Sequence, residues 1–105
     1  MLIFVPEEEP LPAPDFIVHD AIDNVGVVVV EDAKKGKTLT GWVMEGNKTI
    51  KIKALANVPL GHKVALSALK KGDTIIKYGH DIGRMIKGAK TGDHVHTQNL
   101  KTKRW

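Results

Sequence analysis

The chain has 105 residues, a formal net charge of +4, 42% hydrophobic residues and no cysteine. This length fits one domain with one modest core, and the absence of cysteine excludes disulfides, thiol nucleophiles and Cys-ligated zinc or iron–sulfur sites. The longest apolar run, residues 25–30, is far shorter than the roughly 18 residues of a membrane-spanning helix. We therefore expect no membrane segment and take a cytoplasmic protein as the default.

Charge is unevenly distributed along the chain. Residues 1–32 contain eight acidic residues and no Lys or Arg, whereas the remainder contains all 16 basic residues and four acidic ones. Such a division suits an anionic ligand, a nucleic acid or intramolecular complementarity, and it does not choose among them. Because few aromatic residues accompany the lysines, we do not expect nucleic-acid binding.

The first predicted boundary separates a tail from a folded domain. Pro10, Pro12 and Pro14 alternate with other residues in an acidic segment, and proline disfavours both a strand ladder and a helix interior. The sequence therefore predicts a flexible tail at residues 1–14 and one folded domain at residues 15–105.

Short strands are predicted from the start of this domain. Residues 16–19 and 25–30 are rich in β-branched side chains, and Asp23-Asn24 between them is typical of a turn. Residues 48–53 alternate apolar and basic side chains with period two, as in a strand with one buried and one solvated face.

Three glycines recur in a similar setting. Gly36, Gly72 and Gly92 each stand two residues before a predicted strand start. Since glycine readily adopts the left-handed conformation that closes a tight turn, these positions predict three turn-to-strand entries and not ligand-binding loops.

One segment has a helical pattern. Val64, Leu66 and Leu69 are the apolar positions of residues 60–69, and Gly72 follows as a stop, which predicts a helix of at most two turns. All other segments favour short strands, so the predicted fold class is a compact, twisted all-β domain.

Histidines are the first candidates for chemistry. In a strand, the spacing of His94 and His96 places both imidazoles on one face. Such a pair can hold a divalent metal, bind a carboxylate or transfer protons, and a metal site would need a third ligand such as His62, His80 or Asp81. The alternative is a solvated strand face that carries two polar rings.

Two glycine-containing segments give a second signal. Residues 61–63 and 77–83 place cationic or aromatic side chains next to glycines, where backbone N–H groups can approach a ligand closely. The alternative is that these glycines form turns and that Lys77 points into solvent. The sequence contains no nucleotide-binding or α/β-hydrolase motif.

An ordered set of motifs resembles a known family. The strings are PLGHKVAL at 59–66, KGD at 71–73, KYGHDIG at 77–83 and GDHVHTQN at 92–99. Together they resemble the SAF domain of altronate and galactarate dehydratases, which also occurs as the separate small (alpha) subunit of sulfolactate sulfo-lyase. Residues 27–31, 41–45 and 101–105 are closer to that stand-alone subunit.

The resemblance implies a fold, an activity and a partner. The expected fold is a β-clip, working beside a large metal-dependent lyase subunit. Such lyases eliminate sulfite or water from a small anionic 2-hydroxy acid, and the expected cofactor is a divalent metal, Fe²⁺, held mainly by the large subunit. Sulfite elimination is the preferred activity. The alternatives are a sugar-acid dehydratase small subunit and a non-catalytic module that binds a sugar acid or orders a partner.

The resemblance also assigns roles residue by residue. His94 and His96 are the expected catalytic residues, and whether any metal ligand lies in this chain stays open. Gln98 stands where the dehydratases usually have another histidine. The expected substrate-binding residues are His62, Lys63, Lys77, Tyr78 and Asn99.

Overall fold

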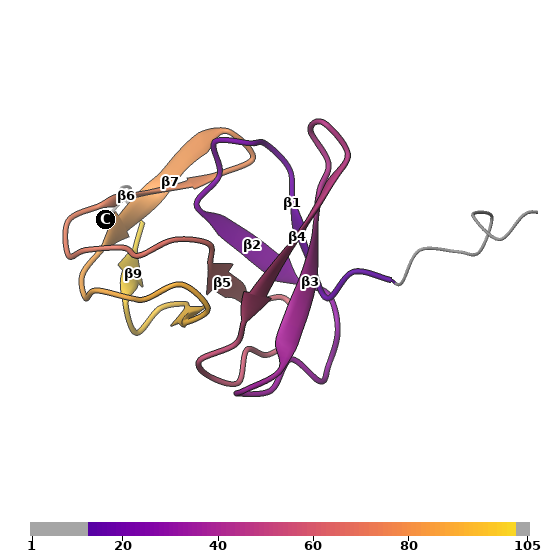
Figure 1. The fold of residues 1–105 in the computed structure, drawn as a ribbon. Helices are drawn as coiled ribbons and strands as arrows, with labels where there is room; N and C mark the ends of the chain where they lie inside the picture. Colours follow the sequence, from indigo (N-terminus) through magenta and orange to yellow (C-terminus); the bar gives the residue numbers. More distant parts are fainter. Residues whose placement is uncertain (1–12, 103–105) are drawn as a thin grey trace, which may run out of the picture.

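The computed structural model describes residues 13–102, which form nine short strands and no helix (Figure 1). The predicted all-β class is confirmed, and nothing in this part of the chain could cross a membrane as a helix. Residues 1–12, most of the predicted tail, lie outside the described residues, as do the last three residues. The strands are β1 (Phe16–Val18), β2 (Val25–Val28), β3 (Thr38–Val43), β4 (Lys48–Lys53), β5 (Lys63–Ala65), β6 (Thr74–Lys77), β7 (His80–Met85), β8 (His94–Val95) and β9 (Leu100–Lys101).

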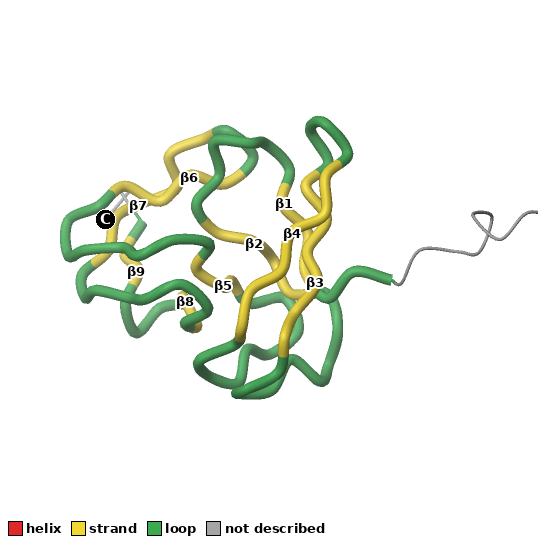
Figure 2. Tube along the Cα trace, viewed as in Figure 1, coloured by secondary structure: helices red, strands yellow, loops and turns green. Residues whose placement is uncertain are grey.

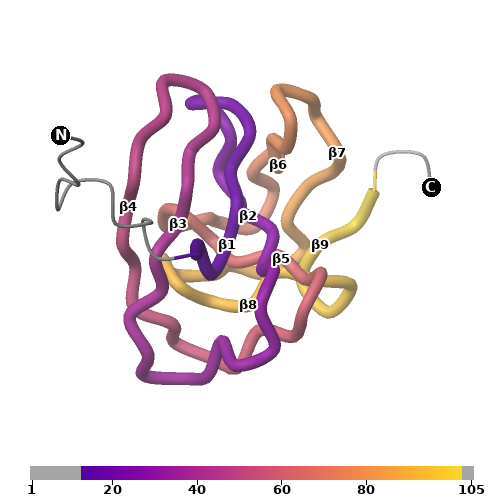
Figure 3. Tube along the Cα trace, turned by 90° about the vertical axis from the view of Figure 1, so that its right-hand side faces the viewer, coloured from indigo at the N-terminus to yellow at the C-terminus, as the bar shows by residue number. Residues whose placement is uncertain are grey.

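The strands form two sheets. A six-stranded sheet has the order β4-β3-β1-β2-β5-β8, and a three-stranded sheet has the order β6-β7-β9. Figure 3 shows β4 and β3 on one side of the molecule and β6, β7 and β9 on the other, with β2 and β5 between them. Strand β1 pairs antiparallel with β2 and parallel with β3. The first two strands of the chain therefore lie at the centre of the large sheet.

Local patterns predicted most strands. Strand β4 occupies residues 48–53 as expected, with Ile50 and Ile52 half-buried and the lysines exposed. The predicted strands at 16–19 and 25–30 appear as the shorter β1 and β2. Alternation identified β4 because one face of this strand contacts the core while the other contacts solvent.

The three turn glycines behave as predicted. Gly36, Gly72 and Gly92 have φ angles of 90°, 93° and 92°, in the left-handed region that favours glycine. Each stands two residues before the first residue of β3, β6 or β8.

The predicted helix at residues 60–69 is wrong. This segment contains β5, in which Val64 pairs with Gly26 of β2 on one side and with His94 of β8 on the other. Pairing on both edges satisfies backbone groups that a two-turn helix would leave open at its ends. Strand pairing with β2 and β8 therefore determines the structure of this segment, although its apolar residues have a helical spacing.

Two clusters of buried side chains form the core. The first contains Phe16 and Leu39 and lies against the large sheet. The second contains Ile75, Met85 and Val95, which come from strands of both sheets. Because β8 contributes to the second cluster through Val95, this core fixes the strand that carries the histidine pair.

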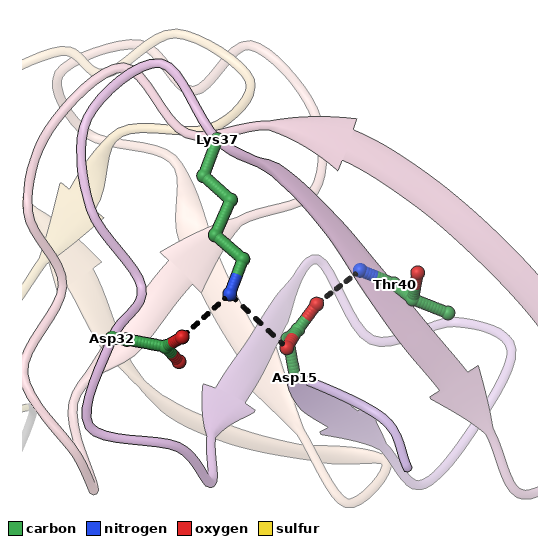
Figure 4. Close-up of polar contacts among 4 residues, drawn as sticks. All are labelled: Asp15, Asp32, Lys37 and Thr40. Carbon is green, nitrogen blue, oxygen red and sulfur yellow. Dashed lines mark hydrogen bonds and ion pairs between the residues drawn. The ribbon is translucent and has the colours of Figure 1, made fainter. Parts of the chain in front are cut away.

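The start of the described domain is held by polar contacts to β3 (Figure 4). The Asp15 amide donates to the Thr40 carbonyl at 2.7 Å, and a carboxylate oxygen of Asp15 accepts from the Thr40 amide at 2.8 Å. Lys37 Nζ lies 2.9 Å from Asp32 and 3.9 Å from Asp15. The two backbone-directed bonds fix β1 against β3, whereas the exposed ion pair adds little.

Candidate functional site

Strand pairing brings three histidines together. His62 immediately precedes β5, His94 begins β8, and His96 follows β8. The antiparallel pairing of these strands, with Val64 opposite His94, joins segments that are 32 residues apart in the chain. Figure 2 shows β5 and β8 side by side. The histidine cluster therefore consists of His62, His94 and His96.

The three imidazoles are in direct contact. His62 Nδ1 lies 2.7 Å from His94 Nε2, and the rings of His62 and His96 stack with centroids 3.7 Å apart. One ring nitrogen of each residue lies within 4.8 Å of the others, and all three side chains are half-buried. His80 and Asp81, the other predicted candidates for a third ligand, do not belong to this cluster.

Asn99 holds the backbone of the histidine pair. Its side-chain oxygen accepts a hydrogen bond from the His96 amide, and its side-chain nitrogen donates to the His94 carbonyl, each at 2.9 Å. The Asn99 side chain is only 7% exposed. These bonds give Asn99 a positioning role, and its predicted contact with substrate stays a prediction.

We expect Asn99→Ala to lower the free energy of unfolding by about 1–3 kcal/mol, because two backbone groups lose their partners beside a buried side chain. Urea denaturation measures this change. Asn99→Asp keeps the acceptor for the His96 amide and should lose less. Asn57→Ala is the control, since Asn57 makes a similar bond, to the Lys35 amide, at an exposed position. An Asn99→Ala loss no larger than that of the control would contradict the positioning role.

Gln98 contacts the outer nitrogen of His94. Its amide nitrogen lies 3.2 Å from His94 Nδ1 and 3.4 Å from the His94 carbonyl oxygen. Gln98 thus lies beside the cluster, and the third imidazole of the cluster comes from His62.

Burial and positive charge shape the ionisation of this site. Burial lowers the pKa of His94 and of His96, and the charges of His62 and Lys63 lower both further. Burial also lowers the pKa of Lys63, and the charge of Lys77 adds to this effect. His96 Nδ1 is buried with no hydrogen-bond partner in the described residues. Burial and the neighbouring positive charge therefore favour the neutral forms of His94 and His96.

Lys77 ends β6, and Tyr78 lies in the turn between β6 and β7, so neither belongs to the histidine cluster. The carboxylate of Asp23 accepts hydrogen bonds from the amides of Tyr78 and Gly79 at 3.0 and 2.8 Å. The Tyr78 ring meets His19 edge-on at 3.9 Å, and Lys77 Nζ lies 5.0 Å from the centre of that ring. Lys77 also influences Lys63, because its positive charge lowers the Lys63 pKa.

Asp23 was recognised in the sequence only as a turn residue. In the structure it is 8% exposed and holds the 78–79 turn as well as the Asp20 amide. Its carboxylate is a positioning group that a turn motif alone did not reveal. The hydrogen bond between the Tyr78 amide and Asp23 joins residues that are 55 positions apart. The sequence near Asp23 therefore gives no indication of this bond.

The cluster can support two kinds of chemistry. Neutral imidazoles transfer protons or donate a lone pair to a metal ion, and Lys63 can form charge-assisted hydrogen bonds with an anion. Ring stacking and the buried His96 Nδ1 distinguish this arrangement from a solvated strand face that happens to carry two histidines.

Comparisons with known proteins identify relatives along most of the chain. A protein named (2R)-sulfolactate sulfo-lyase subunit alpha, from Chromohalobacter salexigens, is 50% identical over 91 residues, which cover 87% of this chain and 97% of that protein. A protein of the same name from Paracoccus pantotrophus is 57% identical over 63 residues, or 60% of this chain and 94% of the relative.

Longer relatives contain the same domain. The altronate dehydratase of Bacillus subtilis is 34% identical over 87 residues, which cover 83% of this chain but 16% of the dehydratase. The family model of the altronate/galactarate dehydratase SAF domain matches residues 14–103, a span that contains every strand and the whole histidine cluster. The chain therefore belongs to the SAF domain family of altronate and galactarate dehydratases.

Proposed function

We propose that this chain is the small subunit of a metal-dependent lyase that eliminates sulfite from a sulfolactate-like 2-hydroxy acid. The observation that carries the proposal is the histidine cluster beside Lys63, in a chain that is 50% identical to a sulfo-lyase alpha subunit across nearly all of that relative. The relative's name, which designates an alpha subunit, also supports a partner subunit. We propose a soluble, cytoplasmic complex of the two.

The reaction sets the demands on the site. A base removes the proton from the carbon that bears the hydroxyl, the neighbouring C–S bond breaks, and its electron pair leaves on sulfite. The remaining enol takes up a proton on carbon, loses its hydroxyl proton and becomes a 2-keto acid. Both the substrate and the leaving group are anionic, so the site must supply cationic donors as well as a group that accepts a proton.

Residues of this chain meet part of these demands. Lys63 and Lys77 are proposed to bind the carboxylate and sulfonate groups through charge-assisted hydrogen bonds, with His62 and Tyr78 as further contacts. His94 and His96 are the proposed catalytic pair, because burial lowers their pKa and a neutral imidazole can accept a proton or hold a metal ion.

A divalent metal, Fe²⁺, is the proposed cofactor. Three imidazole nitrogens and a buried, unpartnered His96 Nδ1 fit such an ion. When bound, the ion would stabilise negative charge on the substrate oxygens. The large subunit is proposed to supply the remaining ligands and most substrate contacts.

Co-expression with a candidate large lyase subunit from the same genome tests the proposal. The purified complex is assayed without oxygen, with added iron, on sulfolactate and altronate in parallel. Release of sulfite together with a 2-keto acid is the expected result. A keto acid from altronate alone would assign a dehydratase instead. If no complex forms and the lone chain binds a sugar acid, the non-catalytic module is favoured.

A further inference from the structure

Three imidazoles converge on one point of the surface from two segments of the chain. Of the five histidines in the sequence, His62, His94 and His96 place ring nitrogens within 4.8 Å of one another. We infer that these three residues bind one divalent transition-metal ion, and that this chain does so without its partner subunit.

The donor set selects the class of ion. All three ligand atoms are imidazole nitrogens, and no carboxylate of residues 13–102 belongs to the cluster. Nitrogen donors suit Fe²⁺, Co²⁺, Ni²⁺, Cu²⁺ and Zn²⁺, whereas Mg²⁺ and Ca²⁺ need oxygen ligands. The chain has no cysteine, so no thiolate competes for the ion.

The protein surroundings prepare the donors. His96 Nδ1 is buried without a hydrogen-bond partner in residues 13–102, and an unsatisfied buried polar atom normally costs free energy. A bound ion gives this nitrogen a partner.

Ring rotation completes the site. The planes of His62 and His96 are only 14° from parallel, so both rings must turn about their Cβ–Cγ bonds to direct lone pairs at one ion. Their backbone stays fixed, because β5 pairs with β8 and Asn99 bonds the backbone of His94 and His96. Metal binding should therefore change side-chain angles and leave the strands in place.

Gln98 is the outer partner of this site. Its amide lies beside His94 Nδ1, the nitrogen that remains when His94 Nε2 binds the ion. A metal-bound imidazole carries its hydrogen on the other nitrogen and donates it to an acceptor. The Gln98 amide supplies that acceptor when its oxygen turns toward the ring.

Three protein ligands leave coordination positions open. Lys63 directly follows His62 in the chain and is half-buried. An anion could therefore bind the ion at one end and Lys63 at the other. The identity of this anion rests on the proposed function, whereas the binding of the ion does not.

The test uses the full chain without a histidine tag. Co²⁺ is titrated by calorimetry and by visible absorption, with Zn²⁺ and anaerobic Fe²⁺ as further probes and Mg²⁺ as the negative control. We expect one ion per chain. The variants His62→Ala, His94→Ala and His96→Ala should each weaken binding at least about 100-fold, more than loss of an outer partner usually costs. Gln98→Leu should weaken it about tenfold.

The two histidines outside the cluster provide matched controls. His19→Ala and His80→Ala remove an imidazole from the chain but not from the cluster, and should leave the affinity within about twofold of the wild type, as expected for a residue that is not a ligand. Circular dichroism checks that each variant is folded. If an alanine variant fails to fold, the imidazole NMR signals of the wild-type chain are measured instead. Zn²⁺ should then shift the signals of His62, His94 and His96 and leave those of the other histidines unchanged.

Two results would overturn the metal site. One is the absence of saturable Co²⁺ or Zn²⁺ binding by the folded wild-type chain. The other is equal loss of affinity in the control and cluster variants. Both results are independent of the lyase assay. If the complex is inactive but its small subunit still binds the ion, the proposed function is wrong and the metal site is still supported.

Discussion

Replacing His96 by alanine is expected to lower the turnover of the reconstituted complex by about 100-fold or more, the size of effect typical of a lost acid–base group. The ring of His96 stacks on His62 at 3.7 Å, and its Nδ1 is buried without a partner. Initial rates of sulfite release under saturating sulfolactate measure the effect.

His80→Ala is the matched control for this experiment. His80 is exposed at the start of β7, in the smaller sheet and outside the cluster. We expect its removal to leave turnover within about twofold of the wild type, since an exposed residue outside the site has no transition-state contact to lose. Unchanged turnover in a folded, assembled His96→Ala complex would show that the cluster lies outside the reaction site.

Metal analysis of the same two complexes separates the possible tasks of His96. If His96 holds the ion, metal content and turnover should fall together. If His96 transfers a proton, turnover should fall while the metal content is kept. The second result would leave His96 as a catalytic residue but remove it from the proposed metal ligands.

Features that depend on neighbouring residues could be predicted from the sequence. The turn before β6 needs a left-handed residue, and Gly72 supplies it with a φ angle of 93°. Strand β4 alternates because only one of its faces meets the core. Both signals lie within a few residues of the feature they predict, so no knowledge of distant partners was required.

Features that depend on distant partners could not be predicted in this way. The segment around Val64 has a helical spacing, yet it is held as a strand by β2 and β8. The sequence offered three candidates for a third ligand beside His94 and His96, and the choice of His62 follows from the pairing of β5 with β8. The roles of Asp23 and Asn99 likewise became visible only with their hydrogen bonds.

Gly41→Ala is expected to destabilise the domain by about 3 kcal/mol, the upper part of the range for overpacking a core. A Cβ atom at Gly41 would overlap the ring carbons Cε2 and Cζ of Phe16, and Phe16 is fully buried. The ring has little room to move toward β2, because Gly26 on that strand also packs against it: a Cβ atom at Gly26 would lie 2.6 Å from Phe16 Cδ2. Thermal unfolding should show a midpoint about 12–24 °C lower.

A double-mutant cycle identifies the cause of this loss. Phe16→Leu shortens the ring that Gly41 accommodates, so Gly41→Ala should cost at least about 1 kcal/mol less in that background than in the wild type. Gly36→Ala is the control for backbone strain, because φ at Gly36 is 90° and a Cβ atom there has no neighbour within 4 Å. It should cost only about 1–2 kcal/mol and show no coupling to Phe16. If the changes in the free energy of unfolding caused by Gly41→Ala and Phe16→Leu are additive, contact with the Phe16 ring is not the reason for glycine at position 41.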